Sequence, residues 1–449
     1  MSARIVVAGT SSGAGKTSIT CGLIGALKAR GHVVQGAKVG PDYIDPSYHQ
    51  MASGRPGRNL DAFMAGPDLI APLLLHGSAG ADITIIEGVM GMFDGASGRG
   101  ELASTAHIAK LTASPVVLVV DATAMSRSAA AIVLGFKSFD PDVQIAGVIL
   151  NRVGSEHHEA LLRDAIEPLG VPVVGAVRRS ERFETPERHL GLVPAPEREA
   201  EARRALDALA GAVAEQVELD TLVRLAKTAP PLPVEPWAPP VAEGPKVRIA
   251  VAAGHAFSFH YRENVESLES VGVELVPFDP SHDTALPEAV DGLMLAGGFP
   301  EVYAEALTGN TPLRRQVAAA VRGGLPTVAE CGGLLYLCEE LDGHPMCGVV
   351  PGKARMAGRL SLGYREAVAE SDSPIAAKGD VLRGHEFHYS TVDPSCGPAP
   401  AWTLRARGRE RPEGFTTPTL SASYLHLHWG AFPDVPLRLA AAARARVAV

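Results

Sequence analysis

Cysteine is scarce in this chain, and the few cysteines present follow no recognisable pattern. There are five in 449 residues, an odd number, irregularly spaced and without a Cys-x-x-Cys pair. Such usage predicts neither a disulfide framework nor a zinc site. The sequence also lacks an apolar run of membrane-spanning length, and its first residues do not follow a signal-peptide pattern. We therefore expect a cytoplasmic protein that does not associate with a membrane.

An excess of basic charge is also missing. The formal net charge is −9, which argues against a nucleic-acid binder that relies on contacts to backbone phosphates. Apolar residues make up 46% of the chain and charged residues 20%, as in a folded globular protein. Because 449 residues exceed what one ordinary core accommodates, we expect two or three domains.

The most informative stretch is the glycine-rich segment Gly9–Thr17, which ends in Gly-Lys-Thr. An apolar, β-branched run (residues 4–8) precedes it, and a segment of helical character (residues 18–30) follows and stops at Gly31. A strand, a glycine-rich loop and a helix together form a cradle for phosphate groups. The usual phosphate loop has its first glycine where this chain has Thr10, so we interpret the segment as a variant of that motif.

This motif predicts a nucleotide site. Backbone N–H groups of the loop face the phosphates, the lysine reaches the outer phosphates, and the threonine hydroxyl is a ligand for Mg²⁺. An asparagine at the end of a later apolar strand (residues 145–152) is the candidate for adenine recognition. The predicted ATP-binding residues are Gly13, Gly15, Lys16, Thr17, Ser18 and Asn151.

Acidic residues follow two predicted strands near this loop. Asp42 and Asp45 come directly after a strand over residues 33–39, Glu87 ends a strand at residues 82–88, and Asp94 lies in the loop beyond it. For Asp42 or Asp45 alone, a role in the turn is the simpler interpretation. Two such residues beside a phosphate loop nevertheless favour a metal or catalytic role, and a strand-end acid is typical of the second Mg²⁺ ligand.

Apolar strands alternate with helical segments as far as a long Ala/Glu/Arg-rich helical stretch, residues 197–227. The alternation predicts an α/β fold with a doubly wound, mainly parallel sheet. The proline-rich segment that follows is incompatible with a helix interior or a central strand, so it predicts an extended linker. We expect three parts, namely a nucleotide-binding domain over residues 1–228, a linker over 229–246 and a second α/β domain over 247–449.

The second half contains a candidate nucleophile. Cys331 stands between an apolar strand (residues 325–329) and a helix that begins with two glycines, which is the arrangement of a nucleophile elbow. The helix N-terminus behind the cysteine is expected to favour its thiolate. Near the C-terminus, His426 and His428 are predicted to share one face of a strand over residues 422–429, and one of them is the candidate base.

The second half resembles a class I glutamine amidotransferase domain of the subgroup that works in cobalamin biosynthesis. The resemblance rests on Ala296–Glu301, on Glu330–Gly333 and on Tyr424–His426. That superfamily usually has a glutamate two residues after the histidine, whereas position 428 here is His, as in the cobalamin subgroup. The resemblance implies a Cys–His pair with His426 as the base and His428 as the fallback. It leaves the third, orienting member open.

The first half resembles dethiobiotin synthetase, whose phosphate loop carries the same extra residue and which activates a carboxyl group with ATP. Both halves in this order, together with Lys38–Pro46 and Arg383–Tyr389, resemble the family of cobyrinic and hydrogenobyrinic acid a,c-diamide synthases. The resemblance covers nearly the whole chain. It implies two doubly wound α/β domains that use ATP, Mg²⁺ and glutamine to amidate a corrinoid polycarboxylic acid.

This resemblance assigns expected roles to individual residues. The Mg²⁺ ligands would be Thr17, Glu87 and Asp45, while Asp42 and Asp94 would bind a second metal or position ammonia and Lys38 would offset charge. Ammonia is expected to reach the first domain along a shielded path, and a homodimer is possible. Backbone groups near the glutamine oxyanion would come from Gly298, Phe299 and Gly333. Guesses for substrate contacts, made from loop position, are Tyr43, Arg58, Arg99, Tyr303 and His385.

Three alternatives remain open at this level. Cobyric acid synthase and a synthase acting on nickel sirohydrochlorin use the same two modules on other substrates. A partition-type ATPase switch shares only the phosphate loop, and the cysteine elbow argues against it because a switch needs no glutaminase.

Overall fold

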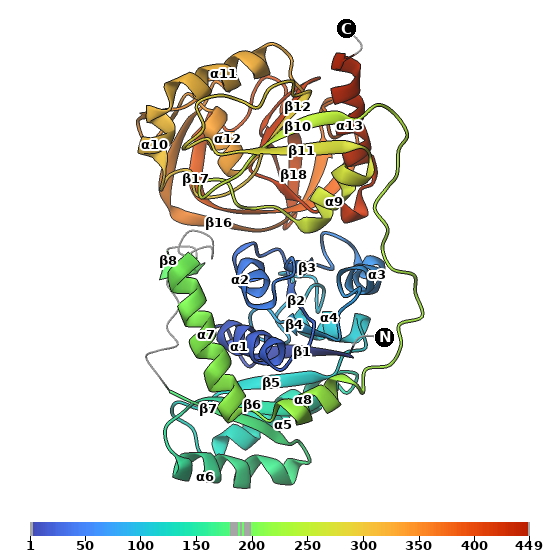
Figure 1. Ribbon diagram of the computed structural model, residues 1–449, viewed down its shortest axis with the longest axis vertical. Helices are drawn as coiled ribbons and strands as arrows, with labels where there is room; N and C mark the ends of the chain where they lie inside the picture. Colours follow the sequence, from blue (N-terminus) through green and yellow to red (C-terminus); the bar gives the residue numbers. More distant parts are fainter. Residues whose placement is uncertain (1–2, 180–186, 189–190, 193–198, 448–449) are drawn as a thin grey trace. The chain divides into compact units, whose positions relative to one another are not determined.

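The computed structural model describes residues 3–179, 187–188, 191–192 and 199–447. The chain divides into two compact units, each with its own sheets and core (Figure 1). Unit 1 consists of Met1–Ala62 and Gly66–Ala238, and unit 2 of Phe63–Ala65 and Pro239–Val449. The change from one unit to the other at Ala238 falls within the proline-rich segment.

Unit 1 is built on a parallel sheet with the strand order β3-β2-β4-β1-β5-β6-β7. Neighbouring strands pair in parallel throughout this sheet. Its central strands are runs of apolar residues that are buried along their length, as expected for a sheet with helices packed on it. The strands are β1 Ala3–Gly9, β2 Val34–Val39, β3 Arg58–Leu60, β4 Ile83–Glu87, β5 Val116–Asp121, β6 Ile145–Val153 and β7 Val173–Arg178.

Helices connect these strands and pack on the sheet. The first begins directly after the glycine-rich loop and ends before Gly31, whose φ of 92° is left-handed and suits glycine. This is the helix stop that the sequence predicts. The helices are α1 Lys16–Ala29, α2 Ile44–Ser53, α3 Pro67–Gly77, α4 Thr105–Leu111, α5 Ser128–Phe139, α6 Glu156–Ile166, α7 Glu199–Gln216 and α8 Leu219–Ala226, with a 3₁₀ turn η1 at Glu167–Leu169 and a short ladder of β8 Glu187–Arg188 and β9 Gly191–Leu192.

The sequence predicts one helical stretch over residues 197–227, of which residues 197 and 198 lie outside the described part. The structure has two helices there, α7 and α8, because the helix is interrupted at residues 217–218. Val217 forms a bridge with Gly175, and Glu218 donates its N–H to the carbonyl of Val174 at 2.8 Å. Backbone groups at residues 217–218 thus hydrogen-bond to β7 at the edge of the sheet, instead of to the preceding turn of a continuous helix. Sequence periodicity carries no sign of this tertiary contact.

Unit 2 contains a second sheet of the same kind, in the order β11-β10-β12-β13-β21-β20. Its pairings are parallel except for the antiparallel pair β20–β21. The fold class predicted from the sequence is therefore confirmed for both units. The strands are β10 Val247–Ala252, β11 Val273–Phe278, β12 Gly292–Leu295, β13 Thr327–Glu330, β20 Phe415–Thr417 and β21 Leu420–Ser423, and the helices are α9 Arg262–Ser270, α10 Ala304–Gly309, α11 Thr311–Arg322, α12 Gly332–Leu337 and α13 Asp434–Val447.

A further sheet in unit 2 was not anticipated. It centres on a long antiparallel hairpin, in which β16 (Lys353–Ala369) is mostly half-exposed and β17 (Val381–Asp393) alternates buried with less buried positions, with charged and polar residues among the apolar ones. This pattern lacks the continuous apolar runs that reveal the parallel strands. The strands are β14 Glu340–Leu341, β15 His344–Pro345, β16 Lys353–Ala369, β17 Val381–Asp393, β18 Trp402–Ala406, β19 Arg409–Glu413 and β22 His426–Leu427, and a 3₁₀ turn η4 follows at Trp429–Ala431.

The boundary between the units divides the proline-rich segment, and each part of the segment contacts the unit to which it belongs. Trp237 donates its backbone N–H to the carbonyl of Pro72 at 2.9 Å, and its ring meets the ring of His76 edge-on. On the other side of the boundary, the carbonyl of Pro245 accepts a hydrogen bond from Arg444 at 3.0 Å. The segment is thus anchored at both ends by contacts internal to a unit.

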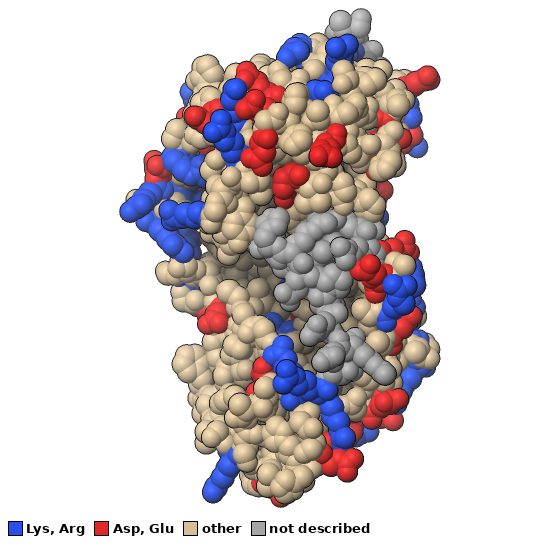
Figure 2. All heavy atoms as spheres, turned by 90° about the vertical axis from the view of Figure 1, so that its left-hand side faces the viewer, with Lys and Arg blue, Asp and Glu red and all other residues tan. Residues whose placement is uncertain are grey.

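The surface mixes the two signs of charge. Figure 2 shows basic and acidic side chains side by side on the face seen there, rather than one continuous basic surface. Within the ranges that the structure describes, no helix has both the length and the apolar character needed to cross a membrane.

Candidate active sites

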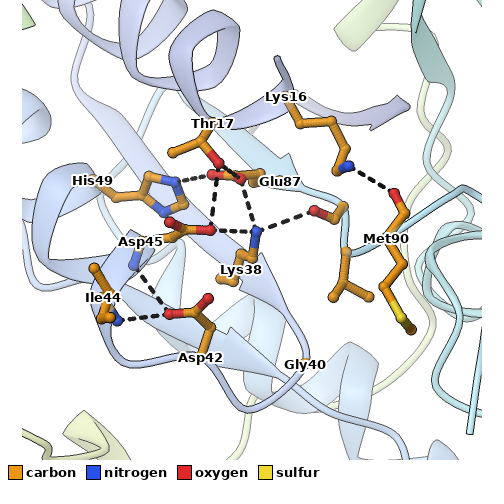
Figure 3. Close-up of polar contacts among 12 residues, drawn as sticks. Lys16, Thr17, Lys38, Gly40, Asp42, Ile44, Asp45, His49, Glu87 and Met90 are labelled. Carbon is orange, nitrogen blue, oxygen red and sulfur yellow. Dashed lines mark hydrogen bonds and ion pairs between the residues drawn. The ribbon is translucent and has the colours of Figure 1, made fainter. Parts of the chain in front are cut away.

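The glycine-rich loop of unit 1 adopts a conformation that requires its glycines. Gly13 and Gly15 have left-handed φ values of 76° and 95°. A Cβ on Gly15 would also lie 2.0 Å from Nδ2 of Asn151, so no larger residue fits there. Lys16 follows at the start of α1 and donates from Nζ to the carbonyl of Ser11 at 3.1 Å. It also donates to the carbonyl of Met90 at 2.6 Å (Figure 3). Its amine therefore lies over the loop, where phosphate groups would bind.

Beside this loop, two carboxylates and a hydroxyl converge (Figure 3). Glu87, fully buried at the end of β4, accepts hydrogen bonds on Oε1 from Thr17 at 2.5 Å and from Lys38 at 2.7 Å. Oδ2 of Asp45 lies 2.5 Å from the Lys38 amine and 3.4 Å from the Thr17 hydroxyl. The three expected metal ligands and Lys38 thus form one cluster, although they come from α1, β2, α2 and β4.

One member of this cluster was not identified from the sequence. His49, fully buried on α2, places Nε2 2.6 Å from Oε2 of Glu87. The contact uses the carboxylate oxygen that Lys38 and Thr17 leave free. His49 lies four residues after Asp45 and therefore on the same helix face, which is the one sequence signal that pointed to it.

The charges in this cluster shift one another strongly. Burial alone would raise the pKa of Glu87, but Lys38 and His49 hold it well below its usual range. For Asp45 the balance is the opposite, because burial, Asp42 and Glu87 raise its pKa despite the ion pair with Lys38. Burial and the neighbouring Lys38 lower the pKa of Lys16 to about 8. The negative charge is therefore concentrated on Glu87, beside the phosphate loop.

The donor set suits Mg²⁺. Two carboxylates and a hydroxyl are hard oxygen ligands, and Mg²⁺ takes few ligands from the protein and completes its shell with water and phosphate. Among the residues described, no group of three or more His, Cys, Asp or Glu side chains forms a ready-made metal cage. A site that shares its ion with a nucleotide needs none.

Two of the expected acids support loops in this structure. Oδ1 of Asp42 accepts the N–H groups of Ile44 at 2.6 Å and Asp45 at 3.1 Å, which caps the start of α2. Oδ2 of Asp94 accepts the N–H of Gly91 at 3.0 Å. The Asp42 contacts match the simpler interpretation of the sequence, in which this residue has a role in the turn.

The remaining predicted residues of unit 1 lie around the loop or away from it. Asn151, at the end of β6, donates from Nδ2 to the carbonyl of Ala14 at 2.9 Å and so supports the phosphate loop directly. Ser18 lies in the first turn of α1. The guessed substrate contacts lie on three separate segments, before α2, at the start of β3 and between β4 and α4 respectively: Tyr43, Arg58 and Arg99.

In unit 2, Cys331 occupies a strained turn between β13 and α12. Its φ of 48° and ψ of −99° are unusual for a residue with a side chain, as expected at a nucleophile elbow. Two residues later only glycine fits, because a Cβ on Gly333 would lie 2.2 Å from the carbonyl oxygen of Leu295. The N–H of Cys331 donates to the carbonyl of Ser423 at 2.7 Å, which ties the elbow to β21.

Burial and the nearby Glu301 raise the pKa of the Cys331 thiol above its ordinary value, although a hydrogen bond from the Gly332 N–H at the start of α12 lowers it. The start of the helix thus favours the thiolate, but burial outweighs this effect. The helix is also only six residues long, which limits its dipole. The resting thiol therefore stays protonated and needs a base to accept its proton.

A glycine turn brings the candidate base to the elbow. Gly298 has a φ of 158°, and a Cβ there would lie 2.1 Å from the carbonyl oxygen of Ala256. A Cβ on Gly332 would lie 3.0 Å from the N of Gly298, while one on Gly297 would lie 2.5 Å from Cε1 of His426. The Gly297–Gly298 turn therefore lies against the elbow on one side and against His426 on the other. Phe299 next to it is buried, and its ring packs edge-on against that of Phe259.

The strand expected over residues 422–429 is divided between two sheets, because β21 ends at Ser423 and β22 begins at His426. Nδ1 of His426, on β22, lies 3.6 Å from Oε2 of Glu330. His428 follows the strand, and its Nε2 lies 3.4 Å from Oε2 of Glu263 on α9. His426 thus lies beside the residue that precedes Cys331, whereas the carboxylate nearest to His428 is on α9.

Two guessed substrate residues also lie in unit 2. His385 is buried, and its ring stacks on that of His426 with centroids 4.9 Å apart. Burial and His426 lower the pKa of His385 well below its usual value, so its ring is neutral. This placement makes it a neighbour of the candidate base rather than an exposed contact. Tyr303 precedes α10 and stacks on His255 at 6.0 Å.

Comparison with known proteins finds similarity in both units. Residues 5–193 match the family described as CobQ/CobB/MinD/ParA nucleotide binding domain. Residues 248–433 match the family described as CobB/CobQ-like glutamine amidotransferase domain. The chain therefore pairs a nucleotide-binding module with a glutamine amidotransferase module.

Similarity to curated proteins extends over nearly the whole chain. A hydrogenobyrinate a,c-diamide synthase of Streptomyces coelicolor is 52% identical over 97% of this chain and 96% of the relative. One of Thermobifida fusca is 50% identical over 98% and 96%, respectively. A cobyrinate a,c-diamide synthase of Dehalococcoides mccartyi is 44% identical over 96% of both chains. The likeness therefore concerns both modules and their order.

Proposed function

We propose, from the premise that this chain belongs to the family of hydrogenobyrinate and cobyrinate a,c-diamide synthases, that it amidates the a and c side-chain carboxylates of a corrinoid polycarboxylic acid. Family membership makes it a glutamine-dependent, amide-forming ligase of cobalamin biosynthesis. Hydrogenobyrinic acid is the first substrate to test, because the relatives of 52% and 50% identity carry that name. Cobyrinic acid is the second.

Unit 1 would activate the carboxylate. A substrate carboxylate oxygen attacks the γ-phosphorus of ATP, the bond to ADP breaks, and an acyl phosphate forms. Ammonia then attacks the acyl carbon, and inorganic phosphate leaves as the amide forms. Lys16 would offset the charge that develops on the phosphates, and the turn of Gly13–Gly15 would hold them by backbone N–H groups. Asn151 would support the loop and border the adenine.

Mg²⁺ would be held by Thr17, Glu87 and Asp45, and when bound it supplies positive charge to the transferring phosphoryl group. Lys38 now occupies the space between the two carboxylates. In the loaded site its amine would be available to the substrate carboxylate or the phosphoryl oxygens. His49 would keep Glu87 oriented throughout. Asp42 and Asp94 would act by holding their loops.

Unit 2 would supply the ammonia. Cys331 Sγ attacks the side-chain amide carbon of glutamine while its proton passes to His426, and that proton then leaves with ammonia. Water hydrolyses the resulting thioester to glutamate and restores the thiol. Backbone N–H groups near Gly298 and Gly333 would hold the oxyanion, with Phe299 fixing the turn from behind. His428 is the reserve candidate for the base.

The observation that carries this proposal is the presence of two half-sites, one for each reaction, in one chain. The cluster of Lys16, Thr17 and Glu87 serves phosphoryl transfer, and the Cys331 elbow with His426 serves amide hydrolysis. A partition-type ATPase switch has no use for the second half-site. Cobyric acid synthase and a nickel-sirohydrochlorin synthase remain the alternatives, and they differ in the carboxylates that they amidate.

Three further features belong to this proposal. The working compartment would be the cytoplasm, because both half-sites act on soluble metabolites. The partners would be ATP, glutamine and the corrinoid, without nucleic acid or membrane. A homodimer is compatible with the activity, since each chain carries both half-sites.

The proposal predicts that the two half-sites can be disabled separately. Cys331→Ala should abolish amidation from glutamine and keep amidation from added ammonium, whereas Lys16→Ala should abolish both. Products are identified by mass spectrometry after incubation with ATP, Mg²⁺ and hydrogenobyrinic or cobyrinic acid, and two added amides are expected. Amides added to a substrate that already carries the a and c amides would instead indicate cobyric acid synthase. Loss of both activities in a folded Cys331→Ala variant would refute the division of labour.

A further inference from the structure

The third member of the glutaminase site is open, because His428 stands where a carboxylate is usual. We propose that Glu330, the residue immediately before the nucleophile, is the positioning residue for His426. This inference rests on the proposed function, since it assigns a role within the proposed glutaminase site. It places the orienting carboxylate on the strand that carries Cys331, and not on the strand that carries the histidine.

The first argument is geometric. Glu330 is the last residue of β13, in the middle of the parallel sheet, and is 7% exposed. Its Oε2 lies 3.6 Å from Nδ1 of His426. That separation is slightly beyond a hydrogen bond, as is common for catalytic contacts before substrate binds. A small movement of either side chain would complete the bond.

The second argument concerns the other carboxylate oxygen. Within the described ranges, Oε1 of Glu330 is buried and makes no hydrogen bond. A buried carboxylate without partners is costly unless a positive charge stands near it. The imidazolium that forms when His426 accepts the thiol proton would supply this charge. The Glu330 carboxylate is therefore placed to pair with that imidazolium when it forms.

The third argument is the orientation of the ring. His385 stacks on His426 with an interplanar angle of 18°, and Gly297 borders the ring at Cε1. These contacts fix the plane of the ring. A carboxylate at Nδ1 fixes the tautomer as well, because it holds the proton there and leaves Nε2 unprotonated. Nε2 is then the nitrogen that takes the proton of Cys331.

A competing pair lies in the same unit. Glu263 Oε2 is 3.4 Å from Nε2 of His428, and both side chains are buried. If His428 were the base, Glu263 would be its carboxylate and Glu330 would have no function in proton transfer. The assignment of Glu330 therefore also decides between the two histidines.

The test compares Glu330→Gln, Glu330→Asp and the matched control Glu339→Gln, an exposed glutamate just beyond α12. Glu330→Gln should lower the kcat of glutamine hydrolysis by about 10²-fold or more, with little change in KM for glutamine. Glu330→Asp, which keeps the charge, should recover part of the loss. All three variants should keep amidation from added ammonium, and Glu339→Gln should match the wild type in every measurement.

A double variant makes the test specific. If Glu330 acts through His426, Glu330→Gln should cause no further loss in a His426→Ala background. An undiminished kcat in Glu330→Gln, or a full additional loss in the double variant, would overturn the proposal. Loss of ammonium-dependent amidation in both Glu330 variants would also overturn it, because the residue would then support the fold. The Cys331→Ala variant separates the two levels: if it kept glutaminase activity, the proposed function itself would fail.

Discussion

At the scale of single residues, the positive charge of Lys38 balances the two buried carboxylates of the nucleotide site. Its amine lies 2.5 Å from Asp45 and 2.7 Å from Glu87, and its side chain is 5% exposed. Asp45 and Glu87 raise the pKa of Lys38 although burial opposes this. Removing the amine leaves two buried carboxylates facing each other without a countercharge.

We therefore predict that Lys38→Met lowers the free energy of unfolding by about 3 kcal/mol in the absence of nucleotide. Lys28→Met is the matched control, because Lys28 is exposed on α1 of the same unit and its loss should have little effect. Urea-induced unfolding of the full chain, followed by circular dichroism, measures the difference. Adding Asp45→Asn should restore part of the stability, and a Lys38→Met variant as stable as the control would contradict the prediction.

Residue positions that follow from a motif could be predicted from the sequence, whereas those that follow from packing could not. Lys16, Thr17 and Glu87 belong to a strand–loop–helix pattern whose geometry is nearly fixed, so their convergence was foreseeable. His49 was missed because no motif marks it, and only the fold of α2 against β4 gives it a partner. The role of Glu330 is of the same kind, since the contact joins residues 96 positions apart.

At the scale of elements, the elbow is secured to the neighbouring strand through a buried carboxyl group. Glu413, at the end of β19, is 1% exposed and accepts hydrogen bonds from the Ser423 hydroxyl at 2.5 Å and the Tyr424 N–H at 2.9 Å. The carbonyl of Ser423 in turn accepts the N–H of Cys331. Burial raises the pKa of Glu413 to about 7, against an ordinary value of 4.5.

This shift predicts how stability depends on pH. The unfolded chain releases the Glu413 proton near pH 4.5 and the folded chain only near 7, so the contribution of this residue is full below 4.5 and is lost as pH rises through 7. The loss should approach about 3 kcal/mol. Urea unfolding at pH 5, 6, 7 and 8 should therefore show wild type weakening relative to Glu413→Gln. Glu410→Gln, exposed on the same strand, is the control and should follow the wild type at each pH.

Which elements could be predicted depends on how their side chains are buried. Strands covered on both faces, such as β4 and β5, are continuous apolar runs and were located to within a residue or two. In the hairpin of β16 and β17, β16 mixes exposed and buried positions without regular alternation, and the pairing register shifts between Met356 and Ser361. Burial alternates along most of β17, but several of its buried positions carry polar residues, among them Glu386 and His388. These strands therefore left no readable hydrophobic period in the sequence.

At the scale of the whole molecule, the chain joins two chemistries that must share a reactive intermediate. Ammonia released into neutral water is mostly protonated and then no longer nucleophilic. An acyl phosphate waiting for it is exposed to hydrolysis in the meantime. The joining of both half-sites in one polypeptide, with a proline-rich segment anchored to each unit, favours transfer of ammonia within a chain. The order of the two units along the chain was predictable from their motifs. Because both units belong to one polypeptide, each synthetase site is always accompanied by one glutaminase site.

A mixing experiment tests this transfer. The Cys331→Ala variant retains the synthetase half-site, and Lys16→Ala retains the glutaminase half-site. If ammonia escaped freely, an equimolar mixture would form amide from glutamine at a rate close to that of wild type at the same site concentration. We expect the mixture to reach only a small fraction of that rate, while added ammonium restores the Cys331→Ala chain fully.

Glutamate release by the Lys16→Ala chain, measured in the same tube, shows whether ammonia was produced. Normal glutamate release without amide would mean that ammonia made on one chain does not serve another, whereas efficient amidation by the mixture would show that the two half-sites exchange ammonia through solvent.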